Sequence, residues 1–246
     1  MKILLYNMGY GTGLNGSLRQ YLLKGWRYLW FPKKVLGRII QLLRNERADL
    51  ICLLEADTGS FRTRFHSQVT EMVRGLGLPF YASLCKYSPR SLWSRLPVFR
   101  KQHTGMMSKK EGQMMAHYLT FGMKRLVEEM IVDGMSIFVV HLGRLSKNVR
   151  RHQLRELGLI LQKCPRPYVV CGDFNIFKGL SEVRGFMEEN QLRRVEHAAS
   201  FPSVQPKKSL DLFFTSPGVQ IKRAGVVQSE LSDHLPVWVE VRTTAG

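Results

Sequence analysis

Residues 168–175 read Tyr-Val-Val-Cys-Gly-Asp-Phe-Asn, and this stretch decides the fold class. Its first four residues are apolar and include two β-branched valines, which is typical of a short buried strand. A glycine, an acid and an amide follow at once, so the strand ends on polar side chains. Other apolar runs in the chain end in the same way, which indicates a protein built around buried strands.

Strands and helices alternate outward from this stretch. Apolar runs predict strands at residues 2–6, 49–55, 79–82, 114–121, 126–132, 135–141, 210–214, 219–223 and 235–241. Apolar residues at steps of three and four predict helices at residues 34–46, 65–76 and 148–162, and from residue 18 until Pro32. Residues 84–113 are basic, are broken by Pro89 and Pro97, and give no clear pattern.

The turns between these elements indicate the type of sheet. Asp133-Gly134 is a hairpin signal, and Gly122 marks a turn between two further strands. Hairpins make neighbouring strands antiparallel, so the sequence predicts an α/β fold with mixed sheets. No internal repeat or linker-like shift in composition divides the chain, and we expect one domain over residues 1–246.

The composition excludes several classes of protein and suggests a partner. The 246 residues include 13 Phe, 8 Tyr and 4 Trp, which excludes intrinsic disorder. No window approaches 18 apolar residues, and the run at residues 3–6 is too short for a signal peptide. A surplus of 37 Lys and Arg over 19 Asp and Glu gives a formal charge of +18. This charge favours a polyanionic partner, with solubility alone as the alternative.

The four cysteines indicate the redox setting of the protein. They show no Cys-x-x-Cys spacing, and Cys52 and Cys171 lie inside apolar runs, where cysteine packs as a small hydrophobic residue. Buried thiols favour a reducing setting, so we expect a cytoplasmic protein that is at most peripheral to a membrane. No protein partner is expected.

Polar residues collect where the predicted strands end. Each such residue is, taken singly, more often a turn former or helix cap than a functional group. Together they are harder to dismiss, because the ends of neighbouring strands meet at one rim of a sheet. The residues are Asn7, Glu55, His141, Asp173, Asn175, Asp211 and the run Ser232-Asp233-His234.

This set of side chains suits hydrolysis of a phosphoester. Carboxylates and an amide are hard oxygen ligands of the kind that Mg²⁺ prefers, and Glu55 with Asn7 beside it is the best candidate. A zinc site is not expected, because there is no thiolate cluster and no His-x-x-x-His. No Ser or Cys lies in a recognisable nucleophile setting. The residues therefore predict metal-assisted attack of water on a phosphodiester or phosphomonoester.

The order of these motifs resembles the endonuclease/exonuclease/phosphatase superfamily, over almost the whole chain. The most specific elements are Gly172-Asp173-Phe174-Asn175 and Ser232-Asp233-His234, about 60 residues apart. The other matching elements are Tyr6-Asn7, Leu54-Glu55, Ser94-Arg95-Leu96-Pro97, Val140-His141-Leu142 and Leu210-Asp211. The resemblance implies a four-layer α/β/β/α sandwich of two packed mixed β-sheets flanked by helices, with the active site at one rim.

The resemblance also implies a role for each matching residue. Glu55 would bind Mg²⁺, for which Mn²⁺ can substitute, with help from Asn7 and Asp233. Asn175 would hold a phosphate oxygen. Asp211 would orient His234, which contacts the phosphate. Either Asp173 or His234 would be the base that activates water, and the sequence does not choose between them.

His141 indicates a branch of this family. Its Val-His-Leu setting is similar to that of sphingomyelinases, inositol polyphosphate 5-phosphatases and the pancreatic deoxyribonuclease, and it implies a second phosphate-facing histidine. Arg150 and Gln153 on the following helix fit the same branch. Leu54 departs from the pattern, because many members have Gln before the metal-binding Glu.

A nuclease acting on DNA or RNA is the first hypothesis for the substrate. We expect Arg95, Arg100 and Lys101, together with Asn175, to bind a polyanionic phosphoester, with nucleic acid favoured. Tyr87 and Trp93 are candidates for base stacking. The same segment also carries Arg90, Lys109 and Lys110. The alternative is that this basic stretch is simply a solvated surface.

A phospholipid phosphodiesterase or phosphatase at a membrane surface is the second hypothesis. Within residues 18–34, the aromatic residues Trp26, Tyr28, Trp30 and Phe31 are edged by basic ones, as in an amphipathic helix at a membrane interface. The basic residues are Arg19, Lys24, Arg27, Lys33 and Lys34. The alternative is that the apolar stripe packs on the sheet, and exposure of Trp30 and Phe31 would favour the lipid hypothesis. A catalytically silent binding module is disfavoured, because every motif residue is present.

Overall fold

A computed structural model describes residues 1–89 and 91–244 of the chain. Within them, twelve strands form two six-stranded sheets. The first sheet has, in spatial order, β11 (Val219–Val226), β12 (Val237–Thr243), β1 (Lys2–Asn7), β2 (Leu50–Asp57), β4 (Gln102–Ser108) and β3 (Phe80–Cys85). The second has β5 (Gln113–Tyr118), β6 (Leu126–Val132), β7 (Met135–His141), β8 (Tyr168–Asp173), β10 (Asp211–Thr215) and β9 (Arg193–Arg194).

Each sheet is mixed, as the hairpin signals predict. The central pairs β1–β2 and β7–β8 are parallel, whereas the other strand pairs are antiparallel. Parallel neighbours end at the same edge of a sheet. Asn7 ends β1, and His141 and Asp173 end β7 and β8, where these two residues are direct register partners. The parallel centres of the two sheets therefore place the polar strand ends at one rim.

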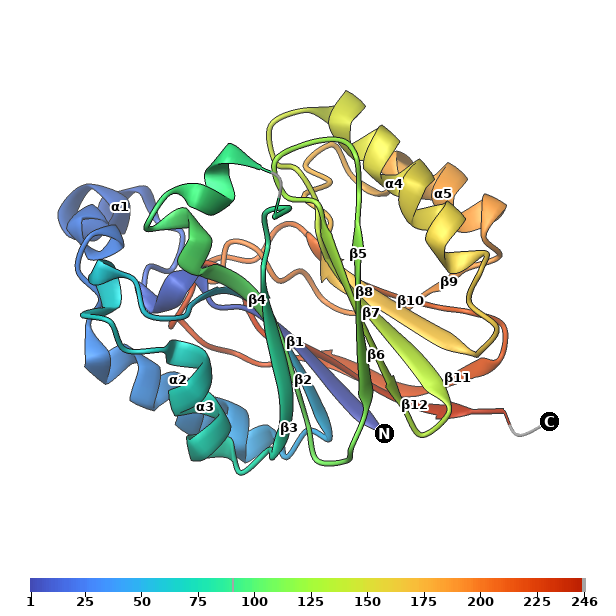
Figure 1. Ribbon diagram of the computed structural model, residues 1–246, viewed down its shortest axis with the longest axis horizontal. Coiled ribbons are helices and arrows are strands. Elements are labelled where there is room, and N and C mark those ends of the chain that lie inside the picture. Colours follow the sequence, from blue (N-terminus) through green and yellow to red (C-terminus); the bar gives the residue numbers. More distant parts are fainter. Residues whose placement is uncertain (90, 245–246) are drawn as a thin grey trace.

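The helices form the two outer layers (Figure 1). α2 (Lys33–Glu46) and α3 (Gln68–Leu76) cover the first sheet, and α4 (Lys147–Leu161) and α5 (Arg184–Glu189) cover the second. Their apolar faces, such as Leu36 and Ile39 of α2, pack on the sheets. The order of layers is helix, sheet, sheet, helix, so the predicted α/β/β/α sandwich is confirmed.

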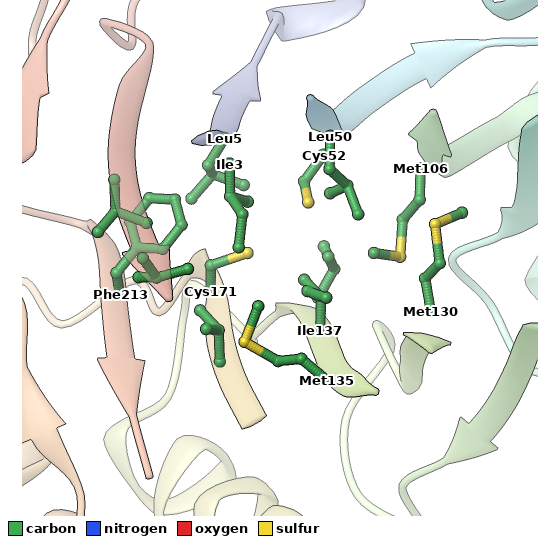
Figure 2. Close-up of a cluster of buried hydrophobic side chains, with 14 of the residues drawn as sticks. Ile3, Leu5, Leu50, Cys52, Met106, Met130, Met135, Ile137, Cys171 and Phe213 are labelled. Carbon is green, nitrogen blue, oxygen red and sulfur yellow. The ribbon is translucent and has the colours of Figure 1, made fainter. Parts of the chain in front are cut away.

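The two sheets pack through a dry apolar core (Figure 2). Side chains alternate between the two faces of a strand, so Ile3 and Leu5 of β1 face the second sheet while Leu4 and Tyr6 face the helices. Cys52 and Cys171 lie in this core as free thiols, in agreement with their apolar setting. Because both faces of the central strands are buried, their sequences are continuously apolar.

Two of the helices differ from the sequence expectations. The single helix expected before Pro32 is wrong: α1 (Leu18–Lys24) ends at Gly25, and a 3₁₀ turn, Gly25–Tyr28, follows. Glycine is a weak helix former, which accounts for the break. α3 begins at Gln68 instead of residue 65, because the Ser67 side chain accepts from the Thr70 N–H and caps the helix.

Residues 84–113, for which the sequence gives no clear pattern, contain an interior strand of the first sheet. β4 lies between β2 and β3 and follows two 3₁₀ turns, Leu92–Arg95 and Phe99–Lys101. Its sequence, Gln-His-Thr-Gly-Met-Met-Ser, lacks the β-branched run that marks the other strands. None of the helices described has the length and apolar character needed to cross a bilayer.

Candidate active site

The ends of β1, β7 and β8 bring three predicted site residues into contact, although they come from different sheets. The Asn7 Nδ2 atom donates to Asp173 Oδ2 at 3.2 Å. His141 Nε2 lies 3.3 Å from the same oxygen. The Asn175 backbone N–H donates to the other carboxylate oxygen of Asp173 at 3.0 Å. Asp173 is buried, and these contacts hold it at the centre of the cluster.

The Gly172–Asn175 segment has an unusual backbone that aims its side chains into the site. Gly172 has a φ of 154°, and a Cβ there would lie 2.0 Å from the Val140 carbonyl oxygen, so only glycine fits. Asn175 has a φ of 51°, a left-handed conformation that Asn tolerates, and its Nδ2 atom donates to the Leu142 carbonyl. This hydrogen bond fixes the amide at the rim.

Glu55 reaches the site through a bulge in β2. The pairing of β2 with β4 shifts register between Leu53 and Ala56, and Glu55 has a φ of 55°. A bulge bends a strand and redirects a side chain. The Glu55 Oε1 atom then lies 3.8 Å from His141 Nε2 and 3.7 Å from Lys124 Nζ. Burial would raise the pKa of Glu55, but the charges of Lys86, Lys124 and His141 lower it.

Lys86 and Lys124 belong to the site but are not among the residues that the sequence singles out. Lys86 is buried, donates to the Tyr10 hydroxyl and lies 5.0 Å from the Tyr10 ring centroid. Burial lowers its pKa to about 7, against the opposing charge of Glu55. Lys124 contacts His141 Nε2, and burial lowers the pKa of this lysine as well. Both lysines lie near predicted strand ends, but lysine there is usually a solvated surface residue, so the sequence gives no specific signal for them.

The environment of His141 keeps its ring neutral. Burial, with the Lys124 charge, lowers the pKa of His141 to about 4, although Asp173 and Glu55 oppose this shift. The Nδ1 atom of His141 is buried and has no hydrogen-bond partner in the described part of the chain. By contrast, the pKa of Asp173 is held well below its usual range, because His141, His234 and Lys124 outweigh the effect of burial. Asp173 is therefore ionised at neutral pH.

His234 has the opposite environment on the other side of the cluster. Its Nδ1 atom lies 2.7 Å from Asp211 Oδ2, which also accepts from the Ser200 hydroxyl at 2.6 Å. Burial would lower the pKa of His234, but Asp211, Asp173 and Asp233 raise it to about 10. The ring is therefore charged at neutral pH, and its Nε2–H is the donor that is not used by Asp211.

Asp233 joins the site to α1. Its Oδ2 atom accepts from the Tyr21 hydroxyl at 2.9 Å. The neighbouring Ser232 hydroxyl donates to the Asn7 carbonyl oxygen at 2.7 Å, which ties this loop to the end of β1. Burial and the Glu55 charge raise the pKa of Asp233, with His234 opposing. The first helix therefore lies directly against the rim.

The oxygen donors at the rim are of the type that Mg²⁺ takes. Asn7 and Glu55 lie on neighbouring parallel strands, where Asn7 is the register partner of Leu54. In residues 1–89 and 91–244, no three Asp, Glu, His or Cys side chains are already grouped as metal ligands, and Glu55 pairs with Lys124 instead. A carboxylate and an amide oxygen at a partly open rim nevertheless fit a hard divalent cation.

The basic residues expected to bind substrate lie outside this cluster. Arg95 and Arg100 are exposed on the 3₁₀ turns before β4, and Lys101 is half-buried beside them. Among the described residues, no hydrogen bond or ion pair joins these three to the cluster. Tyr87 is buried and donates to Gln102, so the expectation that it stacks on bases is wrong, whereas Trp93 is partly exposed.

Two of the remaining basic residues of the same segment lie at the opposite end of the sheet. Lys109 and Lys110 pair with Asp49 and Asp133, beside the start of β1 and so at the end of the sheet away from Asn7. Arg90 lies outside the described residues.

Two residues of α4 support the site from behind. The Gln153 side chain donates to the carbonyls of Phe121 and Lys124 and so holds the loop that carries Lys124. Arg150 is buried and pairs with Glu182 at 2.6 Å. These contacts explain why α4 has polar residues on its buried inner face.

Comparison with known proteins gives one sequence match and many structural ones. The profile of the Endonuclease/Exonuclease/phosphatase family matches residues 29–234, a range that holds every candidate residue except Asn7. No match was found among curated proteins.

Solved structures share the fold at low sequence identity. A mannosyl-6-phosphatase of Bacteroides thetaiotaomicron is 15% identical with a TM-score of 0.68, covering 98% of this chain and 99% of its own. The human Nocturnin catalytic domain with bound sulfate is 16% identical with a TM-score of 0.68, covering 99% and 93%. Beta toxin from Staphylococcus aureus is 15% identical with a TM-score of 0.69, covering 98% and 99%.

Proposed function

The chain belongs to the endonuclease/exonuclease/phosphatase family, whose members hydrolyse phosphoesters, and we propose that it hydrolyses a phosphodiester by attack of water with the help of Mg²⁺. One observation carries the proposal. An ionised Asp173 and a protonated His234 are held at one rim by fixed partners, Asn7 and His141 for the first and Asp211 for the second.

The protonation states assign the work of these two residues. Asp173 is ionised, so it can orient a water molecule and accept its proton as the new P–O bond forms. His234 is protonated, so its Nε2–H can donate to the phosphate and supply a proton to the leaving oxygen as the old P–O bond breaks. The raised pKa keeps His234 protonated at neutral pH, so its ring is not free to accept a proton, and the ionised Asp173 is the acceptor that we propose.

The other residues of the rim bind and neutralise the phosphate. Asn175 presents its amide beside Asp173, and Lys124 adds a positive charge next to His141. Glu55 and Asn7, with Asp233, would hold Mg²⁺, which when bound polarises the phosphate and offsets its negative charge. Neutral His141 holds Asp173 in place through its Nε2 atom.

Nucleic acid remains the candidate substrate that the net charge favours. Arg95 and Arg100 are exposed and free to contact a phosphate backbone. Lys109 and Lys110 cannot extend this surface, because they lie at the other end of the strands. Only part of the positive charge that favours a nuclease therefore lies where it could contact a substrate.

A soluble chromogenic phosphodiester, bis(4-nitrophenyl) phosphate, tests the proposal without assuming a natural substrate. We expect hydrolysis with Mg²⁺ and none with excess EDTA. Asp173→Asn should lose at least about 10²-fold in kcat, whereas the matched control Asp133→Asn, at the far end of the strands, should keep full activity. Hydrolysis that survives EDTA would exclude the metal, and full activity of Asp173→Asn would exclude this site.

A further inference from the structure

The surface of α1 and the turn after it is apolar and exposed to solvent. Leu22 and Leu23 are 78% and 63% exposed, and Trp26, Leu29 and Trp30 are each at least half exposed. Phe31, by contrast, is buried and packs close to Gly11. The exposed apolar residues of this segment therefore do not pack on the sheet, whereas Phe31 packs into the fold and Tyr21 is tied to Asp233.

Two neighbouring segments extend this apolar surface. Phe65, 80% exposed, and Phe61 lie in the loop between β2 and α3, which is tied to the first segment by the Phe31 N–H donating to the Arg62 carbonyl at 3.0 Å. Leu92 begins the 3₁₀ turn Leu92–Arg95, and Leu96 follows that turn. This segment is tied to the β2 end by the Thr58 N–H, which donates to the Lys101 carbonyl. We call these exposed residues of the three segments the apolar collar.

The collar borders the active site. Tyr21, next to Leu22 in α1, donates to Asp233 at the rim. α1 and the green segment before β4 lie at the same end of the ribbon (Figure 1). A phosphoester presented on a surface that the collar touches would therefore arrive beside the catalytic cluster.

The charge around the collar is mostly positive. Residues 1–45 contain eight Lys and Arg but no Asp or Glu, and residues 72–110 also contain no acid. A pocket of about 490 Å³ beside α1 is lined by Lys24, Arg27, Lys33, Lys34 and Arg38. Within the described residues, Glu230 is the one acid that lines it. The Arg27 Nε atom in this region is buried and has no partner among the described residues.

We propose that the collar and its basic pocket dock the protein on an anionic phospholipid bilayer, so that a membrane phospholipid supplies the phosphoester. Exposed Leu and Trp with basic flanks match the apolar and anionic layers of a membrane surface. A second copy of the chain fits poorly, because it would bring the same positive charge against itself. The exposed leucines would not contribute to binding of a nucleic acid. The choice of substrate rests on the proposed phosphoesterase function, but docking does not.

Sedimentation with lipid vesicles tests docking without catalysis. We expect the full-length protein to bind vesicles of phosphatidylcholine with phosphatidylserine far better than vesicles of phosphatidylcholine alone. Leu22→Asp with Leu23→Asp should weaken binding at least about tenfold. Leu159→Asp with Met115→Asp adds the same two charges at exposed apolar positions of α4 and β5, and it should bind as the wild type does.

The basic pocket is tested in the same assay. Lys33→Ala with Lys34→Ala should weaken binding to the anionic vesicles by about fivefold for each lost charge. Binding of the wild type that is equal on both kinds of vesicle would exclude the role of the pocket. Binding unchanged in Leu22→Asp with Leu23→Asp would exclude the collar. A dimer in solution that this variant dissociates would show that the collar is a protein interface and overturn the proposal.

The soluble diester separates docking from chemistry. We expect Leu22→Asp with Leu23→Asp to hydrolyse bis(4-nitrophenyl) phosphate as the wild type does, but to lose hydrolysis of phospholipids in anionic vesicles. If the wild type did not hydrolyse the soluble diester but still bound anionic vesicles, the proposed function would fail while the docking proposal would stand. The lipid substrate would be excluded if the wild type hydrolysed DNA or RNA oligonucleotides but no phospholipid, and if the collar variant hydrolysed the oligonucleotides equally well.

Discussion

The two sides of the active site hold a buried histidine in opposite states. On one side, the lysine side, His141 lies beside Lys124 and Glu55, and Lys86 is a second positive neighbour of the Glu55 charge. Burial with the Lys124 charge lowers the pKa of His141 to about 4. On the other, the acidic side, Asp211 raises the pKa of His234 to about 10, although this ring is also buried. Burial is common to both, so the sign of the neighbouring charge decides the outcome.

This difference shows how one rim can hold both a proton donor and a neutral positioning group at the same pH. His234 is charged and fixed by Asp211, so it can meet a phosphate. His141 is neutral and fixed by Asp173, so it does not compete for that role. The same residue type takes two roles because Lys124 lies beside one ring and Asp211 beside the other.

Removing the charge of Asp211 should have the largest effect on this comparison. In Asp211→Asn, the pKa of His234 should fall toward that of an ordinary histidine, because its nearest carboxylate is lost. We expect kcat to fall by about 10²–10⁴-fold at neutral pH. The alkaline limb of the pH–rate profile should move to lower pH, since His234 would lose its proton earlier.

Ser200→Ala is the control for this change. It removes the other hydrogen bond to Asp211 Oδ2 but leaves the charge in place. Its pH–rate profile should keep the wild-type alkaline limb. An Asp211→Asn enzyme with an unshifted limb would mean that Asp211 does not set the protonation of His234.

Removing Lys124 should make the lysine side more like the acidic side. In Lys124→Met, the pKa of His141 should rise from about 4, because a neighbouring positive charge is lost while Asp173 and Glu55 remain. Burial stays, so we expect a partial shift. NMR titration of the His141 ring measures it, and Lys124→Arg, which keeps the charge, should titrate as the wild type does. Identical titrations for Lys124→Met and the wild type would contradict this account.

The sequence predicted the acidic side of the site better than the lysine side. Asp211 and His234 stand at strand ends within short motifs, so the pattern of apolar runs ending on polar residues finds them. Lys86 follows β3 and Lys124 precedes β6, but lysine at a strand end is usually a solvated surface residue. What brings both of them inward is tertiary packing around Glu55, which no local pattern encodes.

The same limit applies to the fold. The layers follow from alternation and hairpin signals, because the central strands are strongly apolar and glycine marks the turns between several of the strands. β4 was unpredictable, because Gln102, Thr104 and Gly105 become buried only when β2 and β3 lie on either side. Glu55 aims into the site through a bulge, and register shifts of this kind depend on the partner strand.

A buried acid behind the lysine side offers a smaller test, on stability. Glu128 of β6 accepts from the Leu84 N–H of β3, and burial raises its pKa to about 8. Its pKa is higher in the folded chain than in the unfolded one, so folding is progressively weakened as the pH rises from about 4.5 to about 8. Glu128→Gln should remove this loss and stabilise the protein at pH 9 by on the order of a few kcal/mol.

Urea unfolding at several pH values measures the effect. The free energy of unfolding of the wild type should fall relative to that of Glu128→Gln across this pH range, and the two proteins should converge in acid. Glu129→Gln is the neighbouring control, because Glu129 accepts from Ser136 at 2.7 Å and faces His117. A constant difference between wild type and Glu128→Gln at all pH values would show that the Glu128 carboxyl does not titrate in this range.

The smallest effect is expected at the end of the strands away from the site, where the charges are exposed. Lys110 and Asp133 pair at 2.7 Å, but both side chains are largely open to solvent, which screens the pair. Lys110→Ala should change the free energy of unfolding by no more than about 0.5 kcal/mol, and hydrolysis of a soluble diester not at all. The coupling is measured by a double-mutant cycle with Asp133→Asn, since Asp133 has a φ of 50° that Asn tolerates and Ala does not. The charged groups at the rim have shifted pKa values because they are removed from solvent, whereas Lys110 remains in contact with it. A coupling energy as large as that of a buried pair would therefore mean that solvent exposure is not what distinguishes the two ends of the molecule.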